Sequence, residues 1–521
     1  MEGAWVQFHL AWVNDGIAEQ MTRPLLLVIL DGFGEREATE DNAITQARMP
    51  ALDRLRSEGL VSTLSTSGAA VGLPEGQMGN SEVGHLNLGA GRLVDQVSVQ
   101  MTKTIANNTL ADHLVLRGVA DTLKANGGTL HLIGLVSGGG VHSRMEHLVG
   151  ALNAAAGLGI ERIAFHGLTD GRDTAPTSGK TWLKQLESAL PKGAYLASLG
   201  GRFFGMDRDQ RWDRVQKAWT TIVEGKGPTG KSAQEILTQS YAAGETDEFI
   251  TPHHVAGSGI QDGDAVWFLN FRADRVRQFA AALTKHDEPD CFERRIPALS
   301  ACFGMVEYRH DLDLKVLFPK TVPEHTMGEV IADKGLSQFR IAETEKYAHI
   351  TYFFNGGEET RFEGEDRCMV PSPRDVKTYD QKPIMSAQEV TNQLVNALNT
   401  GRYPFCLVNY ANPDMVGHTG VMSAAVEALE GLDACLDQLV SAARKAGYAV
   451  MITADHGNIE QMQQADGSPH TQHTTGPVPL ILLDFHATQL EPGALCDVAP
   501  TCLREMGLEI PTAMTGRVLT R

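Results

Sequence analysis

The chain has 521 residues, of which 42% are hydrophobic and 21% are charged, and its formal net charge is -19. This length exceeds what one hydrophobic core usually holds and is typical of two to four domains of about 150 residues each. The negative charge excludes nucleic acid and anionic membrane surfaces as partners, and no apolar run reaches the ~20 residues of a membrane span, so we expect a soluble protein.

The first twenty residues stand apart from the rest of the chain. They carry Trp5, Phe8 and Trp12 but lack the basic stretch, apolar core and cleavage site of a signal peptide. The apolar run 25–30, which predicts the first strand, follows soon after. We therefore interpret residues 1–20 as a disordered N-terminal extension that takes no part in the fold.

The first predicted strand runs into Asp31, and a helix is expected near residues 50–60. A glycine-rich loop, residues 72–85, then presents Ser81. This loop has neither the G-x-S-x-G pattern of a serine-hydrolase elbow nor the pattern of a P-loop. A serine in such a loop is most often a turn residue, but a serine hydroxyl bound to a divalent metal can lose its proton near neutral pH. Ser81 is therefore a candidate nucleophile if metal ligands lie beside it.

The middle of the chain alternates between predicted strands and helical stretches. The expected strands are residues 130–136, 163–166, 195–199 and 266–270, and a helix is expected from about Met145. Each strand ends in a polar cluster. This spacing is typical of βαβ units and predicts a mostly parallel sheet.

Arginine-rich clusters follow three of these strands. They contribute Arg172, Arg202, Arg208, Arg272 and Arg275. A single arginine beside an aspartate is as often a surface ion pair as a functional group. Three such clusters in succession favour an anion clamp, because the guanidinium group binds phosphate or carboxylate through two hydrogen bonds.

The last third of the chain places aspartate and histidine at the ends of predicted strands 405–410 and 449–453, and one further histidine before the apolar run 478–483. Together with the first strand end, the candidate metal ligands are Asp31, Asp414, His418, Asp455, His456 and His473. One Asp-His pair is usually a turn or a helix cap, but several pairs that follow strands favour a metal site at the carboxyl ends of a sheet. Carboxylate oxygen mixed with imidazole nitrogen suits Mn²⁺ or Zn²⁺ better than Ca²⁺.

These candidates bracket the middle of the chain. Asp31 and Ser81 precede the arginine-rich part, whereas the other candidate ligands follow it. One metal site would therefore need both ends of the chain, which predicts an α/β fold in which the middle part is inserted into a discontinuous domain. The seven cysteines contain no C-x-x-C pair, so structural zinc is not expected and free thiols in a reducing, cytoplasmic compartment are.

Six motifs identify a family when they are taken together. They are residues 76–85, 137–143, 170–173, 206–212, 343–349 and 453–458. In combination they closely resemble the cofactor-independent (2,3-bisphosphoglycerate-independent) phosphoglycerate mutases of the alkaline-phosphatase-like superfamily. The match runs from about Met21 to the C-terminus.

The resemblance implies two α/β domains and an isomerase. Residues 21–95 and 320–521 would form a discontinuous phosphatase-like metal-binding domain, and residues 96–319 an inserted substrate-binding transferase domain. The implied reaction interconverts 3-phosphoglycerate and 2-phosphoglycerate in glycolysis and gluconeogenesis through a phosphoserine intermediate. The expected partners are these small molecules alone, and the expected state is a cytoplasmic monomer.

The resemblance also implies the site residues. Two Mn²⁺ are expected, with Zn²⁺ or Co²⁺ as other candidates, held by Asp414, His418 and His473 in one site and by Asp31, Ser81, Asp455 and His456 in the other. Catalytic roles would fall to Ser81 as nucleophile, Lys346 as a stabiliser of phosphoryl charge and Asp173 as a proton shuttle. The implied substrate-binding residues are His142, Arg172, Asp173, Arg202, Arg208, Arg272, Arg275 and Lys346.

Three positions depart from the family pattern. Phe33 stands where the family usually has tryptophan, Gly138 where it has aspartate, and Arg144 where it has histidine. The alternative function is a metal-dependent phosphatase or phosphonate hydrolase of the same superfamily, in which water attacks a phosphorylated Ser81. The arginine set favours the mutase, because a hydrolase need not retain its leaving group. A non-enzymatic metal-binding protein would leave Ser81 and Asp173 without a purpose.

Overall fold

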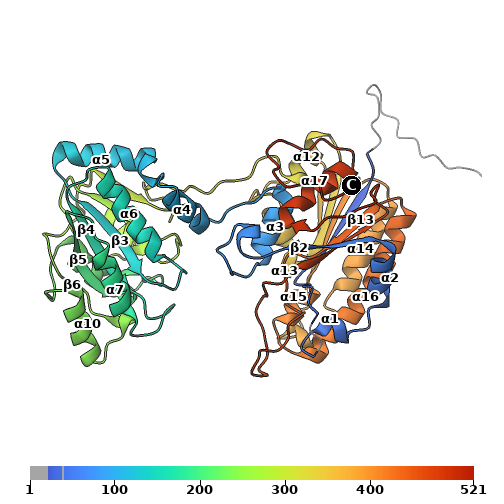
Figure 1. The fold of residues 1–521 in the computed structure, drawn as a ribbon, viewed down its shortest axis with the longest axis horizontal. Helices are drawn as coiled ribbons and strands as arrows, with labels where there is room; N and C mark the ends of the chain where they lie inside the picture. The colour runs from blue at the N-terminus through green and yellow to red at the C-terminus, as the bar shows by residue number, and fades with distance from the viewer. Residues whose placement is uncertain (1–21, 38–39) are drawn as a thin grey trace, which may run out of the picture. The chain divides into compact units, whose positions relative to one another are not determined.

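The computed structural model describes residues 22–37 and 40–521, so the predicted extension of residues 1–20 lies outside the described residues. The chain divides into two compact units, each with its own sheet (Figure 1). The first unit joins the described residues up to Val94 with Val322–Arg521, and the second is Asp95–Thr321. No helix among the described residues is both long enough and apolar enough to cross a membrane.

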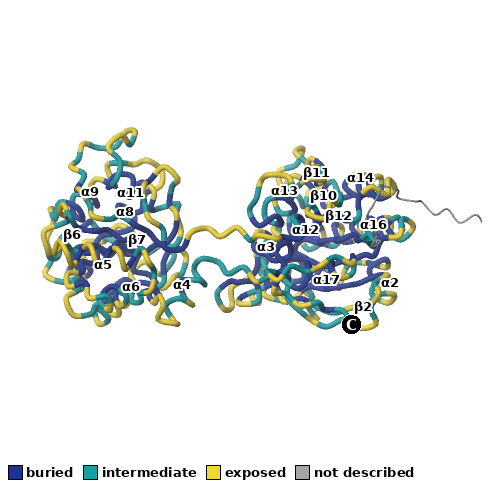
Figure 2. Tube along the Cα trace, turned by 90° about the horizontal axis from the view of Figure 1, so that it is seen from above, coloured by how far each residue is buried: buried dark blue, intermediate teal, exposed yellow. Residues whose placement is uncertain are grey.

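The first unit is built on an eight-stranded sheet. In spatial order its strands are β11 (Glu365–Val370), β10 (Gln338–Glu343), β12 (Phe405–Tyr410), β1 (Leu25–Leu30), β13 (Ala449–Thr453), β14 (Val478–Leu483), β2 (Leu60–Ser65) and β15 (Gly493–Ala494). The first five strands run parallel to one another, and β14 is antiparallel to both of its neighbours. Strands β12, β1 and β13 are fully buried, as expected of a parallel sheet covered on both faces (Figure 2).

Helices cover both faces of this sheet. They are α1 (Ala43–Gln46), α2 (Pro50–Glu58), α3 (Ser81–Ala90), α12 (Met327–Asp333), α13 (Thr344–Ala348), α14 (Ala387–Asn399), α15 (Asn412–Gly417), α16 (Met422–Lys445) and α17 (Val498–Glu505). Helices α14, α16 and α2 pack together on one side, and α3, α12 and α17 on the other (Figure 1). Asp433 of α16 is buried and accepts hydrogen bonds from the backbone N–H groups of Ala51 and Leu52, so it satisfies the first turn of α2.

The second unit is a seven-stranded sheet with helices around it. Its strands, in spatial order, are β6 (His253–His254), β5 (Ala194–Gly201), β4 (Ile163–Thr169), β3 (Leu130–Val136), β7 (Ala265–Phe268), β8 (Ala301–Gly304) and β9 (Lys315–Val316). All pairs are parallel except β5 with β6. Its helices are α4 (Val97–Ala106), α5 (Leu114–Asn126), α6 (Met145–Gly157), α7 (Gly179–Ser188), α8 (Arg202–Gly205), α9 (Trp212–Val223), α10 (Ala233–Ala242) and α11 (Arg277–Thr284).

The predicted elements are confirmed where the apolar pattern is continuous. Strands β1, β3, β12, β13 and β14 have the predicted bounds, and α6 begins at the predicted residue. The helix expected near residues 50–60 ends at Glu58, because residue 60 already begins β2. The strand expected at 266–270 ends at Phe268. Asn270 lies beyond the strand, and its side chain accepts a hydrogen bond from the backbone N–H of Leu135. Strands β10 and β11 are absent from the sequence prediction, because half of the residues in each are polar or charged and neither strand forms a continuous apolar run.

Candidate active site

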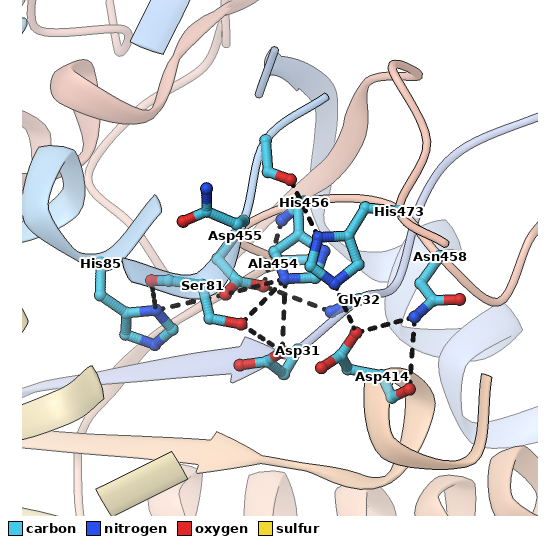
Figure 3. Close-up of polar contacts among 12 residues, drawn as sticks. Asp31, Gly32, Ser81, His85, Asp414, Ala454, Asp455, His456, Asn458 and His473 are labelled. Atoms are coloured by element: carbon cyan, nitrogen blue, oxygen red, sulfur yellow. Dashed lines mark hydrogen bonds and ion pairs between the residues drawn. The ribbon is translucent and has the colours of Figure 1, made fainter. Parts of the chain in front are cut away.

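Three adjacent parallel strands bring three aspartates together at one edge of the first sheet. Asp31 follows β1 directly, Asp414 lies in α15 just after β12, and Asp455 follows β13 by one residue. Because these strands are neighbours and parallel, their carboxyl ends meet at the same edge. All three side chains are buried, and Figure 3 shows them converging with His456 and His473.

Ser81 is placed at this edge by the start of α3. The preceding Asn80 caps the helix, since its side chain accepts a hydrogen bond of 3.0 Å from the backbone of Val83. Ser81 is therefore the first helical residue, at the positive end of the helix dipole. One turn along, a Cβ on Gly84 would lie 2.8 Å from Cβ of Asp455, so only glycine lets the helix pack this closely against the carboxylate.

The hydroxyl oxygen of Ser81 is surrounded by charged and titratable groups. It lies 2.8 Å from Nζ of Lys346, 3.0 Å from Nε2 of His456 and 3.2 Å from Oδ1 of Asp31. The side chain is almost fully buried. These contacts distinguish Ser81 from an ordinary turn residue.

Lys346 reaches the same point from α13, the short helix after β10. Its Nζ lies 2.6 Å from both Oδ1 of Asp31 and Oδ2 of Asp414. Burial acts to lower the pKa of Lys346, but the carboxylates around it, Asp31 foremost, raise the pKa overall above its ordinary value. The ammonium group therefore stays charged beside the serine hydroxyl.

The Nε2 atoms of His418 and His473 lie close together beside the carboxylate of Asp414. Their Nδ1 atoms lie 2.8 Å from the carbonyl of Thr471 and 2.9 Å from the carbonyl of Gly79, respectively. A carbonyl can only accept, so these contacts put the ring protons on Nδ1 and leave Nε2 free to bind a metal. Both Nε2 atoms lie 3.2 Å from Oδ1 of Asp414 and 3.2 Å from each other.

The centre fits a divalent cation. The buried side chains Asp31, Asp414 and Asp455 carry three negative charges, and Lys346 supplies one positive charge. Among the described residues, Oδ2 of Asp455 is buried without a hydrogen-bond partner. Burial, and next the charge of Asp455, raise the pKa of Asp31, as expected where negative charge is in excess. A buried excess of this kind is costly unless a cation compensates it.

The ligand sets can be compared with those predicted from the sequence. Asp414, His418 and His473 have donor atoms close enough together to share one ion, and so do Asp31, Asp414 and His456. Asp31, His85 and Asp455 form a third such group. The predicted ligands thus lie in one cluster, although no single group in the described part of the chain joins Asp455 with His456 as the second predicted set would. His85 was not predicted, because it is one residue within the glycine-rich motif.

Asn458 is a second residue missed at the sequence level. Its Nδ2 donates a hydrogen bond of 2.8 Å to Oδ1 of Asp414, and its backbone N–H donates to Oε2 of Glu460 at 2.8 Å. Asn458 therefore fixes the orientation of Asp414 (Figure 3). Its position three residues after Asp455 in the motif 453–458 was the available signal.

The second unit gathers several of the predicted clamp residues around Arg202. This side chain is buried at the start of α8, and its Nη1 lies 2.6 Å from Oδ1 of Asp170 and 2.5 Å from Oδ2 of Asp173. Asp170 also accepts hydrogen bonds from the backbone N–H groups of Arg172 and Asp173. The loop after β4 and the loop after β5 are thereby held together.

His142 and Asp274 extend this cluster. Nε2 of His142 lies 4.0 Å from Oδ2 of Asp173, and its Nδ1 lies 3.6 Å from Oδ1 of Asp274. Burial, and next the charge of Arg202, lower the pKa of His142 to about 4, so this imidazole is neutral at pH 7. Asp274 also lies 3.0 Å from Arg208.

A cavity of about 370 Å³ opens beside this cluster and is rich in arginine. The arginines that line it are Arg172, Arg202, Arg208, Arg211, Arg214 and Arg275. Burial, and next the charge of Arg202, lower the pKa of Arg275, a sign of crowded positive charge. Two of the lining arginines, Arg211 and Arg214, were not predicted. Arg272 does not line this cavity, and its Nε lies 3.5 Å from Asp274.

The three departures from the family pattern have different surroundings. Phe33 is fully buried in the core of the first unit. Arg144 lies 3.4 Å from Glu146 at the start of α6. A Cβ on Gly138 would lie 2.2 Å from the indole ring of Trp182, so Trp182 of α7 fills the space where a side chain would begin.

The fold and the buried cluster of carboxylates and imidazoles define a metal-dependent α/β enzyme. The family model of the metalloenzyme superfamily matches residues 23–510, which accounts for the divalent metal site.

Similar proteins identify the family within this class of enzymes. The 2,3-bisphosphoglycerate-independent phosphoglycerate mutase of Syntrophotalea carbinolica is 46% identical over 96% of this chain and 99% of its own length. That of Myxococcus xanthus is 49% identical over 93% of this chain and 96% of its own. A crystal structure of the Leishmania mexicana phosphoglycerate mutase at low cobalt concentration has a TM-score of 0.58 and 32% identity, covering 95% of this chain and 97% of that one. The chain belongs to the family of 2,3-bisphosphoglycerate-independent phosphoglycerate mutases, a family of isomerases, and the resemblance found in its six motifs is confirmed.

Proposed function

We propose that the chain interconverts 3-phosphoglycerate and 2-phosphoglycerate, a step of glycolysis and gluconeogenesis, without added 2,3-bisphosphoglycerate. The observation that carries this proposal is the environment of Ser81, whose hydroxyl oxygen lies within 3.2 Å of Lys346, His456 and Asp31 in a buried centre. A hydroxyl activated in this way can accept a phosphoryl group and later return it.

The proposed metal site holds two Mn²⁺ ions, with Zn²⁺ or Co²⁺ as other candidates. The ligands would be Asp414, His418 and His473 for one ion and Asp31, Ser81, Asp455 and His456 for the other. When bound, divalent ions would make the serine hydroxyl more acidic and offset the charge of the phosphoryl oxygens. Lys346 would contribute a further positive charge at the same place.

In the first half of the proposed reaction, Ser81 has already given up its hydroxyl proton to solvent, and its Oγ attacks the phosphorus atom of 3-phosphoglycerate. The bond between Ser81 Oγ and phosphorus forms as the bond between phosphorus and the C3 oxygen breaks. The C3 oxygen leaves as a hydroxyl after taking a proton, for which Asp173 is the proposed donor. The intermediates are phosphorylated Ser81 and free glycerate.

In the second half, the glycerate turns while the arginines of the second unit retain it. Its C2 hydroxyl gives its proton back to Asp173 as the C2 oxygen attacks the phosphorus atom on Ser81. The bond between phosphorus and Ser81 Oγ breaks as the new bond forms, so Ser81 is returned without its proton and no proton is gained or lost overall. The hydrogen bond between Arg202 and Asp173 supports this role, because it orients the carboxylate in a region rich in positive charge. The first unit would thus be the phosphatase-like domain and the second unit the transferase domain.

The alternative function is hydrolysis, in which water rather than glycerate takes the phosphoryl group from Ser81. The arginine-lined cavity of about 370 Å³ favours the mutase, because only a mutase has to hold the dephosphorylated intermediate. We further propose that the protein works as a cytoplasmic monomer on small molecules alone. None of its seven cysteines, all within the described residues, forms a disulfide, as expected in a reducing compartment.

The test supplies each phosphoglycerate separately to the purified, Mn²⁺-loaded protein. 2-Phosphoglycerate is followed with coupled enolase, and free phosphate is measured in the same sample. A mutase converts each substrate into the other and releases little phosphate. Release of one phosphate per substrate consumed, without interconversion, would instead establish the hydrolase.

A further inference from the structure

His85 lies next to the metal centre but has no role in the reaction described above. It is the fifth residue of α3, one turn after Ser81, and it is fully buried. Figure 3 shows contacts from its ring to the backbone of Ser81 and to Asp455. Its donor atoms are close enough to those of Asp31 and Asp455 to form a possible ligand group, so its hydrogen bonds decide whether it binds a metal.

The hydrogen-bond partners of His85 determine which of its ring nitrogens donates and which accepts. Nδ1 lies 2.8 Å from the carbonyl oxygen of Ser81, which can only accept, so Nδ1 carries the proton. The same Nδ1 lies 3.2 Å from Oδ2 of Asp455. Nε2 lies 3.0 Å from Nδ2 of Asn409. This amide nitrogen is also 2.7 Å from Oδ2 of Asp31, a carboxylate that accepts, so Nδ2 is a donor and Nε2 of His85 accepts from it.

Both ring nitrogens of His85 are therefore in use within the protein, so His85 is not a metal ligand. It instead closes a chain of contacts that runs from Asp455 through His85 and Asn409 to Asp31. The chain joins the ends of the three adjacent strands β13, β12 and β1 to the first turn of α3. Oδ2 of Asp31 is held by a hydrogen bond from Asn409, whereas Oδ2 of Asp455 is in contact with Nδ1 of His85 at 3.2 Å.

We propose that His85 is a positioning residue, which acts with Asn409 to hold Asp31, Asp455 and the backbone of Ser81 in the geometry that binds the metal. This inference deepens the proposed function and rests on the metal site named there. Carboxylates that bind a metal depend on such outer hydrogen bonds, and their loss typically costs 10-fold to 100-fold in metal affinity.

Two substitutions distinguish the contribution of Nδ1 from that of Nε2. The amide of His85→Asn can place a donor near the position of Nδ1, whereas the longer amide of His85→Gln reaches the position of Nε2. His85→Leu removes both contacts. For each variant the measurements are the Kd for Mn²⁺ by titration of the metal-free protein, kcat and KM for 3-phosphoglycerate, and thermal unfolding with and without Mn²⁺.

We expect His85→Leu to weaken Mn²⁺ binding about 10-fold to 100-fold. Its kcat at saturating Mn²⁺ should fall, while KM stays close to that of the wild type because the arginines of the second unit are intact. His85→Asn should recover most of the Mn²⁺ affinity and His85→Gln much less. Asn409→Leu should weaken binding by a similar factor, and the double variant with His85→Leu should add little to either single loss.

The control is His147→Asn, which changes a buried histidine of the second unit and should leave the Mn²⁺ affinity unchanged. Mn²⁺ binding by His85→Leu within twofold of the wild type would overturn the proposal. So would equal affinities for the Asn and Gln variants, because a purely space-filling role does not depend on which nitrogen is replaced. Since metal affinity is read without turnover, absence of mutase activity in the wild type would overturn the proposed function but not this inference.

Discussion

The ammonium nitrogen of Lys346 donates a hydrogen bond of 2.8 Å to the hydroxyl oxygen of Ser81. The two residues are 265 positions apart in the chain and come from two different helices, Ser81 from α3 and Lys346 from α13. A positive charge held against the nucleophile stabilises the serine oxygen as it loses its proton and the phosphoryl oxygens as they approach.

Replacing Lys346 with methionine should therefore lower kcat by about 10²–10³-fold, the usual cost of losing one electrostatic stabiliser. The metal-free variant should also be less stable, because Asp31 and Asp414 lose a buried partner. Steady-state kinetics at saturating Mn²⁺ and thermal unfolding in chelator measure the two effects. A Lys346→Met enzyme with kcat within threefold of the wild type would remove Lys346 from the catalytic group.

Replacing Ser81 with alanine should lower mutase activity by at least about 10⁴-fold, because the phosphoryl group loses its carrier. The fold should persist, since Asn80 still caps α3. Mass spectrometry of the wild type, quenched shortly after mixing with 3-phosphoglycerate, should detect phosphate on the peptide that contains Ser81. Near-normal turnover by Ser81→Ala would rule out the covalent intermediate.

The metal ligands could be predicted from the sequence because most of them follow continuous apolar strands. Asp31 and Asp455 come within two residues of the end of a buried strand. An apolar run followed by a polar residue therefore identifies both of them as candidates. Lys346 does not follow an apolar run. It follows β10, whose sequence includes the buried Arg340, and a strand with a buried charge does not match an apolar pattern. Only the family resemblance indicated this residue.

The residues that orient the ligands could not be predicted from local pattern. Asn409 is one polar residue within the buried strand β12, and His85 is one histidine within α3. Their roles depend on contacts with Asp31 and Asp455, which pairing of distant strands brings near. The same holds for the contact between Gly138 and Trp182, which no spacing in the sequence encodes.

Replacing Arg275 with alanine should weaken retention of glycerate. We expect a loss of roughly 2–4 kcal/mol in kcat/KM, the scale of a charged hydrogen bond left without its partner. Free phosphate should rise, because water reaches phosphorylated Ser81 after glycerate escapes. The matched control is Arg295→Ala, an exposed arginine of the same unit paired with Asp262, which should change neither quantity.

If Arg275→Ala behaves like Arg295→Ala in both the kinetic and the phosphate assay, the arginine-lined cavity does not hold the glycerate intermediate. Arg275 would then be a structural residue that donates a hydrogen bond of 3.1 Å to the carbonyl of Met206.

Replacing Gly138 with alanine should destabilise the second unit by about 1–3 kcal/mol, because the new methyl group overlaps the indole ring of Trp182. Urea unfolding measures the change. Gly118→Ala is the control, since a Cβ there meets nothing within 4 Å in the middle of α5, and it should be stabilising by about 0.5–1 kcal/mol. Adding Trp182→Ala to Gly138→Ala should recover part of the loss. A Gly138→Ala variant as stable as the wild type would show that Trp182 moves aside freely.

Removing divalent metal should abolish activity without unfolding the protein. In the metal-free state Asp31, Asp414 and Asp455 share only the charge of Lys346, so the Ser81 hydroxyl loses the cations that would make it acidic. We expect EDTA to reduce turnover to background and added Mn²⁺ to restore it, with no requirement for 2,3-bisphosphoglycerate at any stage.

Thermal unfolding should occur at a lower temperature in EDTA, because a cation that binds only the folded state stabilises it by mass action. Circular dichroism at room temperature controls for loss of fold. Full turnover in EDTA, after dialysis that removes all detectable metal, would contradict the assignment of the carboxylate and imidazole cluster as a metal centre.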